Sequence, residues 1–191
     1  MLLLMDQLDS SALDFSSMEF FVLASIQNEG LTSYYALQQR AGLQPGGIRN
    51  VMRNLEHAGV VVRADASARR RRDFALTAKG REHLKRSWKN CLREYPDVEG
   101  VLRAAYVATV MGDVHYAGWY LEDQALRRRT TAEEKQMEAT RLEESQTGPL
   151  STFMWMRTLI EARRRQVESQ TLESLGRLLR ERHQPHVSSE P

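Results

Sequence analysis

The segment from Pro45 to Gly59 constrains the fold of this chain more than any other. Its apolar residues recur at positions i, i+3, i+4 and i+7, which places them on one face of an α-helix: Ile48, Val51, Met52 and Leu55. Pro45 suits the first helical turn, because its ring fixes φ and its missing N–H would have no partner there. The opposite face carries a different set: Gly46, Arg49, Asn50, Arg53 and His57. We therefore expect a helix that is anchored on one side and presents cations and amides on the other.

Signals on both sides of this helix predict a small domain around it. Ser16 and Glu19 have the spacing of a capping box, which predicts a buried helix ending near Gly30. Thr32 is expected to cap a second helix, which ends at 41–43. After Gly59, the β-branched segment 60–63 and the alternating segment 72–76 predict a β-hairpin. Thr77 then resembles the cap of a further helix that reaches 95–97. This order is that of a winged helix-turn-helix, in which a hairpin tip lies beside the recognition helix.

The charge of the chain is unevenly distributed. The overall net charge is only +2, but residues 31–90 hold thirteen Lys or Arg against four acids, a net +9, so the remainder carries −7. Such asymmetry indicates a polyanionic partner for the basic part. Four of the cations are consecutive and would sit at the hairpin tip, where a wing lies along a nucleic-acid backbone: Arg69, Arg70, Arg71 and Arg72. Arginine and asparagine side chains on the helix can also bond purine edges in a major groove.

Three stretches of the chain resemble the PadR-like winged-helix transcription regulators. They are the run 44–48, the run Leu-Glu-His-Ala-Gly-Val at 55–60, and Asp73 to Thr77 followed by Gly80. The similarity covers about residues 18–88. Two departures are Arg49, where the family commonly has a tyrosine, and Tyr34-Tyr35, where it has a Gly-Tyr pair. The resemblance implies a dimeric DNA-binding regulator with a helical C-terminal part for dimerisation.

The C-terminal half is expected to be helical throughout. Val98 begins an apolar segment that continues to Val110, and Thr130 and Thr131 offer overlapping capping boxes for another helix, to about Glu144. Ser151 is expected to cap a last, long helix that ends near His183. The heptad pattern of that helix is imperfect, which favours packing across a dimer over a regular coiled coil. We therefore predict a mainly α fold with a small β-hairpin, divided into a winged helix-turn-helix domain at 1–95, with an N-terminal arm at 1–15, and a helical dimerisation region at 96–191.

Two sets of candidate site residues follow. The DNA-binding set comprises Gln44, Gly46, Arg49, Asn50, Arg53 and Arg69 to Arg72. The second set is aromatic and would line a pocket for a small-molecule effector: Tyr106, Tyr116, Trp119, Tyr120, Phe153 and Trp155. Core packing is the competing interpretation of this aromatic set.

Other classes of function find no support in the sequence. The chain lacks a Gly-rich phosphate loop, a nucleophile elbow and a His-Glu-x-x-His motif, so neither an enzyme nor a cofactor or metal is expected. The single cysteine, Cys91, cannot form an internal disulfide, and no apolar run is long enough for a membrane span. We expect a cytoplasmic homodimer that binds double-stranded DNA and regulates transcription, with repression as the expected outcome. The alternative is a winged-helix adaptor that binds an acidic protein partner and has no preference among DNA sequences.

Overall fold

The computed structural model describes residues 15–30, 32–41, 45–64, 73–145 and 148–182. The chain divides into two compact units, 1–81 and 82–191. The boundary along the chain falls between Arg81 and Glu82, within one helix. The functional division after Tyr95 that the sequence suggests stays a prediction. Among the described residues, no helix is both long enough and apolar enough to cross a membrane.

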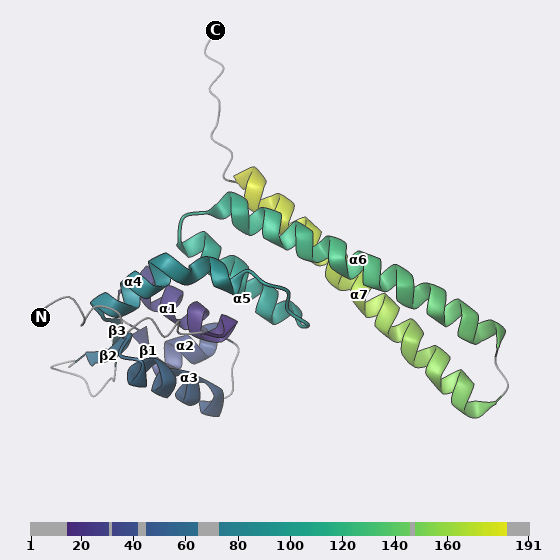
Figure 1. Ribbon diagram of the computed structural model, residues 1–191, viewed down its shortest axis with the longest axis horizontal. Helices are drawn as coiled ribbons and strands as arrows, with labels where there is room; N and C mark the ends of the chain where they lie inside the picture. Colours follow the sequence, from purple (N-terminus) through teal and green to yellow (C-terminus); the bar gives the residue numbers. More distant parts are fainter. Residues whose placement is uncertain (1–14, 31, 42–44, 65–72, 146–147, 183–191) are drawn as a thin grey trace, which may run out of the picture. The chain divides into compact units, whose positions relative to one another are not determined.

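The N-terminal unit is a winged helix-turn-helix (Figure 1). Its elements are α1 (Ser17–Glu29), β1 (Thr32–Ser33), α2 (Tyr34–Ala41), α3 (Pro45–His57), β2 (Val61–Ala64), β3 (Asp73–Leu76) and the start of α4 (Ala78–Ser87). The strands form one antiparallel sheet in the order β1-β3-β2, with Val61 opposite Leu76 and Ala64 opposite Asp73. The expected fold class and the β2–β3 hairpin are confirmed.

The helix ends follow the capping chemistry of the sequence in most places. The Ser16 side chain accepts from the N–H of Glu19 and the Glu19 carboxylate accepts from the N–H of Ser16, so the expected capping box is present. Gly30 ends α1 with φ of 79°, a left-handed conformation that glycine adopts without steric cost. Helix α3 begins at Pro45, as expected for a proline in the first turn.

The expectation that Thr32 caps the second helix is wrong. Thr32 is buried in the short strand β1, opposite Phe74, where a β-branched residue fits the pleated surface well. Ser33 is the capping residue instead, because its hydroxyl accepts from the N–H of Ala36 at 3.2 Å. The chain thus uses one residue to complete the sheet and the next to start α2.

A single apolar core joins the three helices to the sheet. Side chains with no more than 1% exposure come from every layer: Phe20, Leu23 and Ile26 of α1, Leu37 of α2, Ile48, Met52 and Leu55 of α3, and Phe74 of β3. Burial of each such side chain favours folding by about 1.5–3 kcal/mol. Tyr34 packs edge-on against Phe74, with ring centroids 4.6 Å apart. The core fixes α3 against the sheet by its apolar face and leaves the other face to solvent.

The C-terminal unit is a helical hairpin with a shorter helix beside it. After the end of α4 come the 3-10 helix η1 (Trp88–Cys91), α5 (Val98–Val110), α6 (Val114–Glu144) and α7 (Pro149–Arg182). Helices α6 and α7 lie side by side along their lengths (Figure 1). They approach each other closely at two glycines, since a Cβ on Gly176 would stand 2.8 Å from the carbonyl oxygen of Gly118.

Two expected helix starts in this unit are wrong. Thr130 and Thr131 lie inside α6, where their hydroxyls donate to the carbonyls of Leu126 and Arg127, four residues earlier. The helix continues there because one of the preceding arginines, Arg128, is buried and donates to the carbonyl of Tyr95 at 2.9 Å. The last helix begins at Pro149 and not after Ser151, whose hydroxyl donates to Gly148 in the first turn.

The helix expected from Thr77 to about Tyr95 is also shorter than predicted. Helix α4 ends at Ser87, η1 follows, and the segment from Leu92 to Asp97 is irregular. Side chains of α6 and α7 donate hydrogen bonds to the carbonyls of this irregular segment. Tyr120 donates to Arg93 at 2.7 Å and Arg165 donates to Pro96 at 3.1 Å. These bonds replace those that a continuous helix would have made.

Candidate nucleic-acid interface

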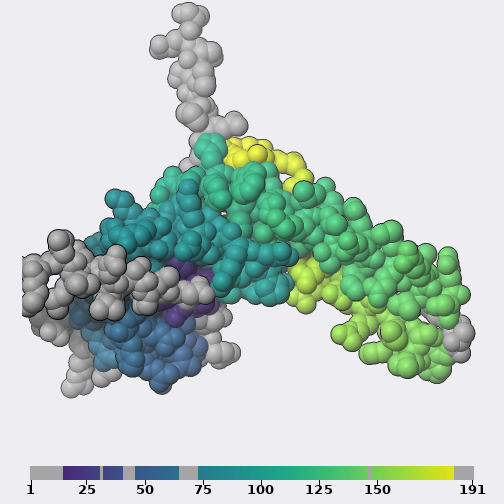
Figure 2. Space-filling view, in the orientation of Figure 1, coloured from purple at the N-terminus to yellow at the C-terminus, as the bar shows by residue number. Residues whose placement is uncertain are grey.

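Helix α3 has one buried face and one fully exposed face. Ile48, Met52 and Leu55 are at most 1% exposed. Gly46, Arg49, Asn50 and Arg53 are all exposed, as the spacing predicts. Figure 2 shows α3, in blue, at the surface of the N-terminal unit. Two guanidinium groups and an amide therefore stand in one row on a helix that its core contacts hold in place.

Hydrogen bonds order several side chains of this helix. The Arg53 Nη2 group donates to Oδ1 of Asn50 at 3.1 Å, so the two side chains form a unit on the exposed face. Asn54 belongs to a different side of the helix, because its Nδ2 group donates to Oε1 of Glu19 on α1 at 3.3 Å. Glu19 is in turn part of the cap of α1.

An ion pair connects α3 to the strand that begins the wing. Arg63 of β2 donates from Nε to Oε1 of Glu56 at 2.6 Å and from Nη2 to Oε2 at 3.0 Å, which is a bidentate arrangement. The hydrogen bond to Glu56 and the charge of its carboxylate raise the pKa of Arg63. Sequence reasoning did not identify this pair. The sequence feature that could have indicated the pair is Glu56, the single acid of a helix that otherwise carries cations and amides.

The turn between α3 and β2 is fixed to the start of α4 by Thr77. Its hydroxyl donates to the carbonyl of Gly59 at 2.8 Å and accepts from the N–H of Gly80 at 3.0 Å, so it caps α4 as expected. Strands β2 and β3 run from Val61 to Ala64 and from Asp73 to Leu76. Arg69 to Arg72 and Gln44, all members of the predicted DNA-binding set, lie outside the described residues.

The six residues of the predicted effector pocket do not line one pocket within the chain. Tyr116 is in the first turn of α6 with its ring 5.4 Å from that of Trp119, which is 55% exposed. Phe153 and Trp155 lie near the start of α7, beside the opposite end of α6. Because 31 residues of helix span about 45 Å, these two groups are far apart. Within one chain these residues are therefore not brought together, and the effector pocket stays a prediction.

The two remaining aromatic residues of that set have structural contacts. Tyr106 is half-buried in α5, and Tyr120 is buried with its hydroxyl bonded to the carbonyl of Arg93. Burial raises the pKa of Tyr120 well above its usual value. Core packing, the competing interpretation, accounts for Tyr120.

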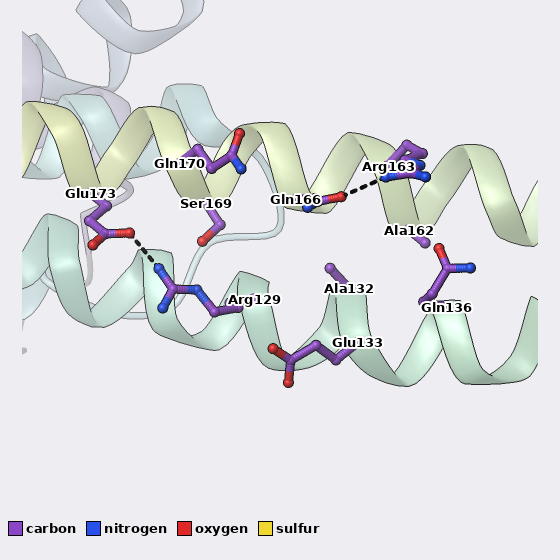
Figure 3. Close-up of a pocket in the computed structure, with 10 residues that line it drawn as sticks. All are labelled: Arg129, Ala132, Glu133, Gln136, Ala162, Arg163, Gln166, Ser169, Gln170 and Glu173. Atoms are coloured by element: carbon purple, nitrogen blue, oxygen red, sulfur yellow. Dashed lines mark hydrogen bonds and ion pairs between the residues drawn. The ribbon is translucent and has the colours of Figure 1, made fainter.

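A cavity of about 550 Å³ lies elsewhere, between α6 and α7 (Figure 3). Small residues, Ala132, Ala162 and Ser169, form part of its lining, and charged residues of both signs flank them. Arg129 and Glu173 form an ion pair across it, and Arg163 donates to Gln166 at 3.1 Å. The described lining contains none of the predicted aromatic residues.

Comparison with known proteins finds resemblance only at the level of structure. No protein-family model matches the chain, and no curated protein matches it. Among solved structures, the crystal structure of Bacillus subtilis PadR in complex with operator DNA is similar to this chain. The identity is 16%, the similarity covers 85% of this chain and 98% of that chain, and the TM-score is 0.36.

Proposed function

We propose that this protein is a sequence-specific regulator of transcription that binds double-stranded DNA through α3. The observation that carries the proposal is the exposed row of Arg49, Asn50 and Arg53 on a helix whose other face is buried. Side chains of these types bond base edges in the major groove, and an α-helix fits that groove. In a helix-turn-helix, the second helix enters the groove by its N-terminal residues; Arg49 and Asn50 lie in the first half of α3, and Arg53 is one turn further along.

The connection between β2 and β3 supplies the second part of the proposal. It contains four consecutive arginines at 69–72, and the Glu56–Arg63 pair fixes the start of its hairpin to α3. We assign these arginines to contacts with phosphates, which add affinity without sequence preference. Base contacts from α3 and backbone contacts from the wing would then act side by side.

We further propose that the protein acts as a homodimer through α7. Five apolar residues on this helix are 44–68% exposed: Phe153, Met156, Ile160, Val167 and Leu178. Their separations of 3, 4, 7 and 11 residues place them on one stripe, which we call the α7 stripe. The opposite side of α7, with Ala162, Ser169 and Leu172, is buried. A second copy that covers the stripe by the same surface gives a two-fold dimer, and hence a near-palindromic operator. A dimer seated on an operator excludes other proteins from it, which is the basis for proposing repression.

Selection of bound duplexes from a random pool, followed by binding titrations, tests this function. The Arg71→Ala, Arg72→Ala double variant should weaken binding to all duplexes alike and reduce the salt dependence by about 0.9 in the log–log slope for each lost phosphate contact. Arg49→Ala and Asn50→Ala should instead change which sequence is preferred. Arg141→Ala, an exposed arginine of α6, is the control for the loss of one positive charge and should change neither.

The same titrations separate this function from a protein-binding adaptor. An adaptor would use the basic face for an acidic protein surface and would recover no common sequence from the random pool. Unchanged affinity for the wing double variant, or a pool without any enriched sequence, contradicts the proposed function.

A further inference from the structure

We propose that α3 reads guanine, because Arg49 and Arg53 on its exposed face present only hydrogen-bond donors to a duplex and the amide oxygen of Asn50 between them already accepts from Arg53. The inference rests on the proposed function and names the class of DNA that the same surface would select. Within the described stretch 46–53, arginine guanidinium groups provide donors and no acceptor: Arg49 and Arg53. Asn50 differs from the two arginines, because its amide has both donors and an acceptor. Whether this face offers an acceptor to a base therefore depends on Asn50.

The acceptor oxygen of Asn50 already holds one bond inside the protein. Arg53 Nη2 donates to Asn50 Oδ1 at 3.1 Å, which occupies one of the two lone pairs of that oxygen and leaves the Nδ2 hydrogens of Asn50 as donors. An asparagine with a free amide bonds adenine in two places, by accepting from N6 and donating to N7. The contact with Arg53 disfavours the first of these two bonds, because N6 of adenine would have to share the oxygen with Arg53. Asn50 therefore favours bases that offer acceptors.

The other acceptors of α3 are also engaged or lie away from this part of the face. Both carboxylate oxygens of Glu56 accept from Arg63. Asn54 is directed to Glu19 on α1. His57 is the last residue of α3, one turn beyond Arg53 and at the opposite end from Arg49. No acidic side chain therefore opposes the donors of Arg49, Asn50 and Arg53 within the described part of α3.

Guanine is the base that matches a row of donors. Its major-groove edge offers two acceptors, N7 and O6, whereas adenine and cytosine each present an amino donor there and thymine offers a single acceptor, O4. Arginine bonds both guanine acceptors at once, and the amide hydrogens of Asn50 can bond either. We infer that each half-site of the operator contains guanines at the base pairs under Arg49, Asn50 and Arg53.

The first test uses the intact protein and the duplex selected from a random pool. Each half-site guanine is replaced in turn by 7-deazaguanine, which lacks the N7 acceptor in the major groove. At contacted positions we expect binding to weaken about tenfold per replacement. Inosine, which lacks only the minor-groove amino group of guanine, is the matched control and should change affinity by less than about twofold.

The second test changes the protein and not the DNA. Arg53→Ala frees Oδ1 of Asn50, so a second selection with this variant should enrich adenine at one position where the original protein selects guanine. Arg141→Ala, on α6, should keep the original preference. Arg53 is exposed, so the variant should fold, and a thermal melt checks this.

The outcomes distinguish this inference from the function on which it rests. A selected half-site without guanine, a 7-deazaguanine duplex that binds as tightly as the original, or an unchanged preference in Arg53→Ala overturns the inference while sequence-specific binding stands. A pool without any enriched sequence overturns the proposed function, and this inference with it. Enriched guanines that are sensitive to 7-deaza replacement and insensitive to inosine support it.

Discussion

Gly80, in the first turn of α4, packs directly against the backbone of Val60. A Cβ added to Gly80 would stand 2.9 Å from the carbonyl carbon of Val60, 3.2 Å from its Cα and closer still to its oxygen. The same carbonyl accepts from the N–H of Thr77 at 3.1 Å. The turn that ends α3 and the cap that starts α4 are thus held together by backbone contact, for which a residue without a side chain is required.

Gly80→Ala is therefore expected to destabilise the N-terminal unit strongly. The new methyl group meets backbone, which cannot move aside as a flexible side chain can, so we expect a loss of about 3 kcal/mol in the free energy of unfolding. Gly46→Ala is the matched control, because nothing lies within 4 Å of its Cβ position and it is inside a helix. That variant should gain about 0.5–1 kcal/mol. Urea unfolding measures both, and an equally stable Gly80→Ala protein contradicts the packing described.

Glu56 and Arg63 allow a test of how the wing is coupled to α3. Arg63→Lys keeps the charge but cannot form both bonds of the pair, and Glu56→Gln removes the charge. We expect each to weaken specific DNA binding roughly threefold to tenfold, because the wing is then less firmly placed beside α3. The pair is exposed, so the melting temperature should move by less than about 2 °C.

Glu82→Gln is the control for these variants. Glu82 pairs with Arg86 within α4, at 3.0 Å, and both side chains are exposed. This change should leave DNA binding unaltered. If Glu56→Gln binds specific duplexes as tightly as Glu82→Gln does, the pair has no part in placing the wing.

The N-terminal unit was largely predictable because its signals are local. Ser16 with Glu19, and Thr77, determine helix starts through bonds within one turn, and Pro45 stands at the start of α3. The spacing of Ile48, Met52 and Leu55 determines which face of α3 is buried. Strand β1 was missed because two residues carry no periodicity, and its partner β3 lies about forty residues further along the chain.

The C-terminal unit was less predictable because distant contacts override local signals there. Thr130 and Thr131 have the sequence of a capping box, but the helix runs unbroken through that point, where the buried Arg128 bonds the carbonyl of Tyr95 and pairs with Glu168 of α7. Neither partner can be inferred from the run of three arginines. The aromatic residues of the predicted effector pocket show the same limit. Their type gives no indication that the length of α6 separates Tyr116 from Phe153 within one chain.

The α7 stripe makes a prediction about oligomeric state. Ile160→Glu with Val167→Glu places two carboxylates in the proposed dimer interface without touching the face of α7 that packs on α6. We expect the dissociation constant of the dimer to rise by at least about a hundredfold, because buried charges without partners are costly. Light scattering after size exclusion measures the mass.

Gln136→Glu, on the exposed surface of α6, adds a carboxylate outside the stripe and should leave the dimer intact. The circular dichroism of both variants should match that of the parent chain. A parent protein that is monomeric at micromolar concentration, or a double variant that stays dimeric, contradicts the α7 stripe as the interface.

Cys91 gives the unit 82–191 a predictable response to alkali. Burial, the largest influence, raises the pKa of this thiol from 9.0 to about 12, and the residue is 1% exposed. Between these two values the unfolded chain loses its proton while the folded chain keeps it. Ionisation then favours the unfolded state. The stability that the protonated thiol contributes to the free energy of unfolding is fully present below pH 9, and it falls by about 1.4 kcal/mol per pH unit as pH rises towards 12.

The variant Cys91→Ala isolates this effect. It should cost about 1 kcal/mol at neutral pH through the cavity left by the sulfur, and it should lose less stability than the parent chain between pH 9 and 10. Tyr120, whose pKa burial also raises, contributes a loss of the same sign at higher pH, so the comparison is best made below pH 10. Urea unfolding at a series of pH values gives the two slopes. Parallel slopes for the parent and the variant would mean that the Cys91 thiol ionises as readily in the folded chain as in the unfolded one.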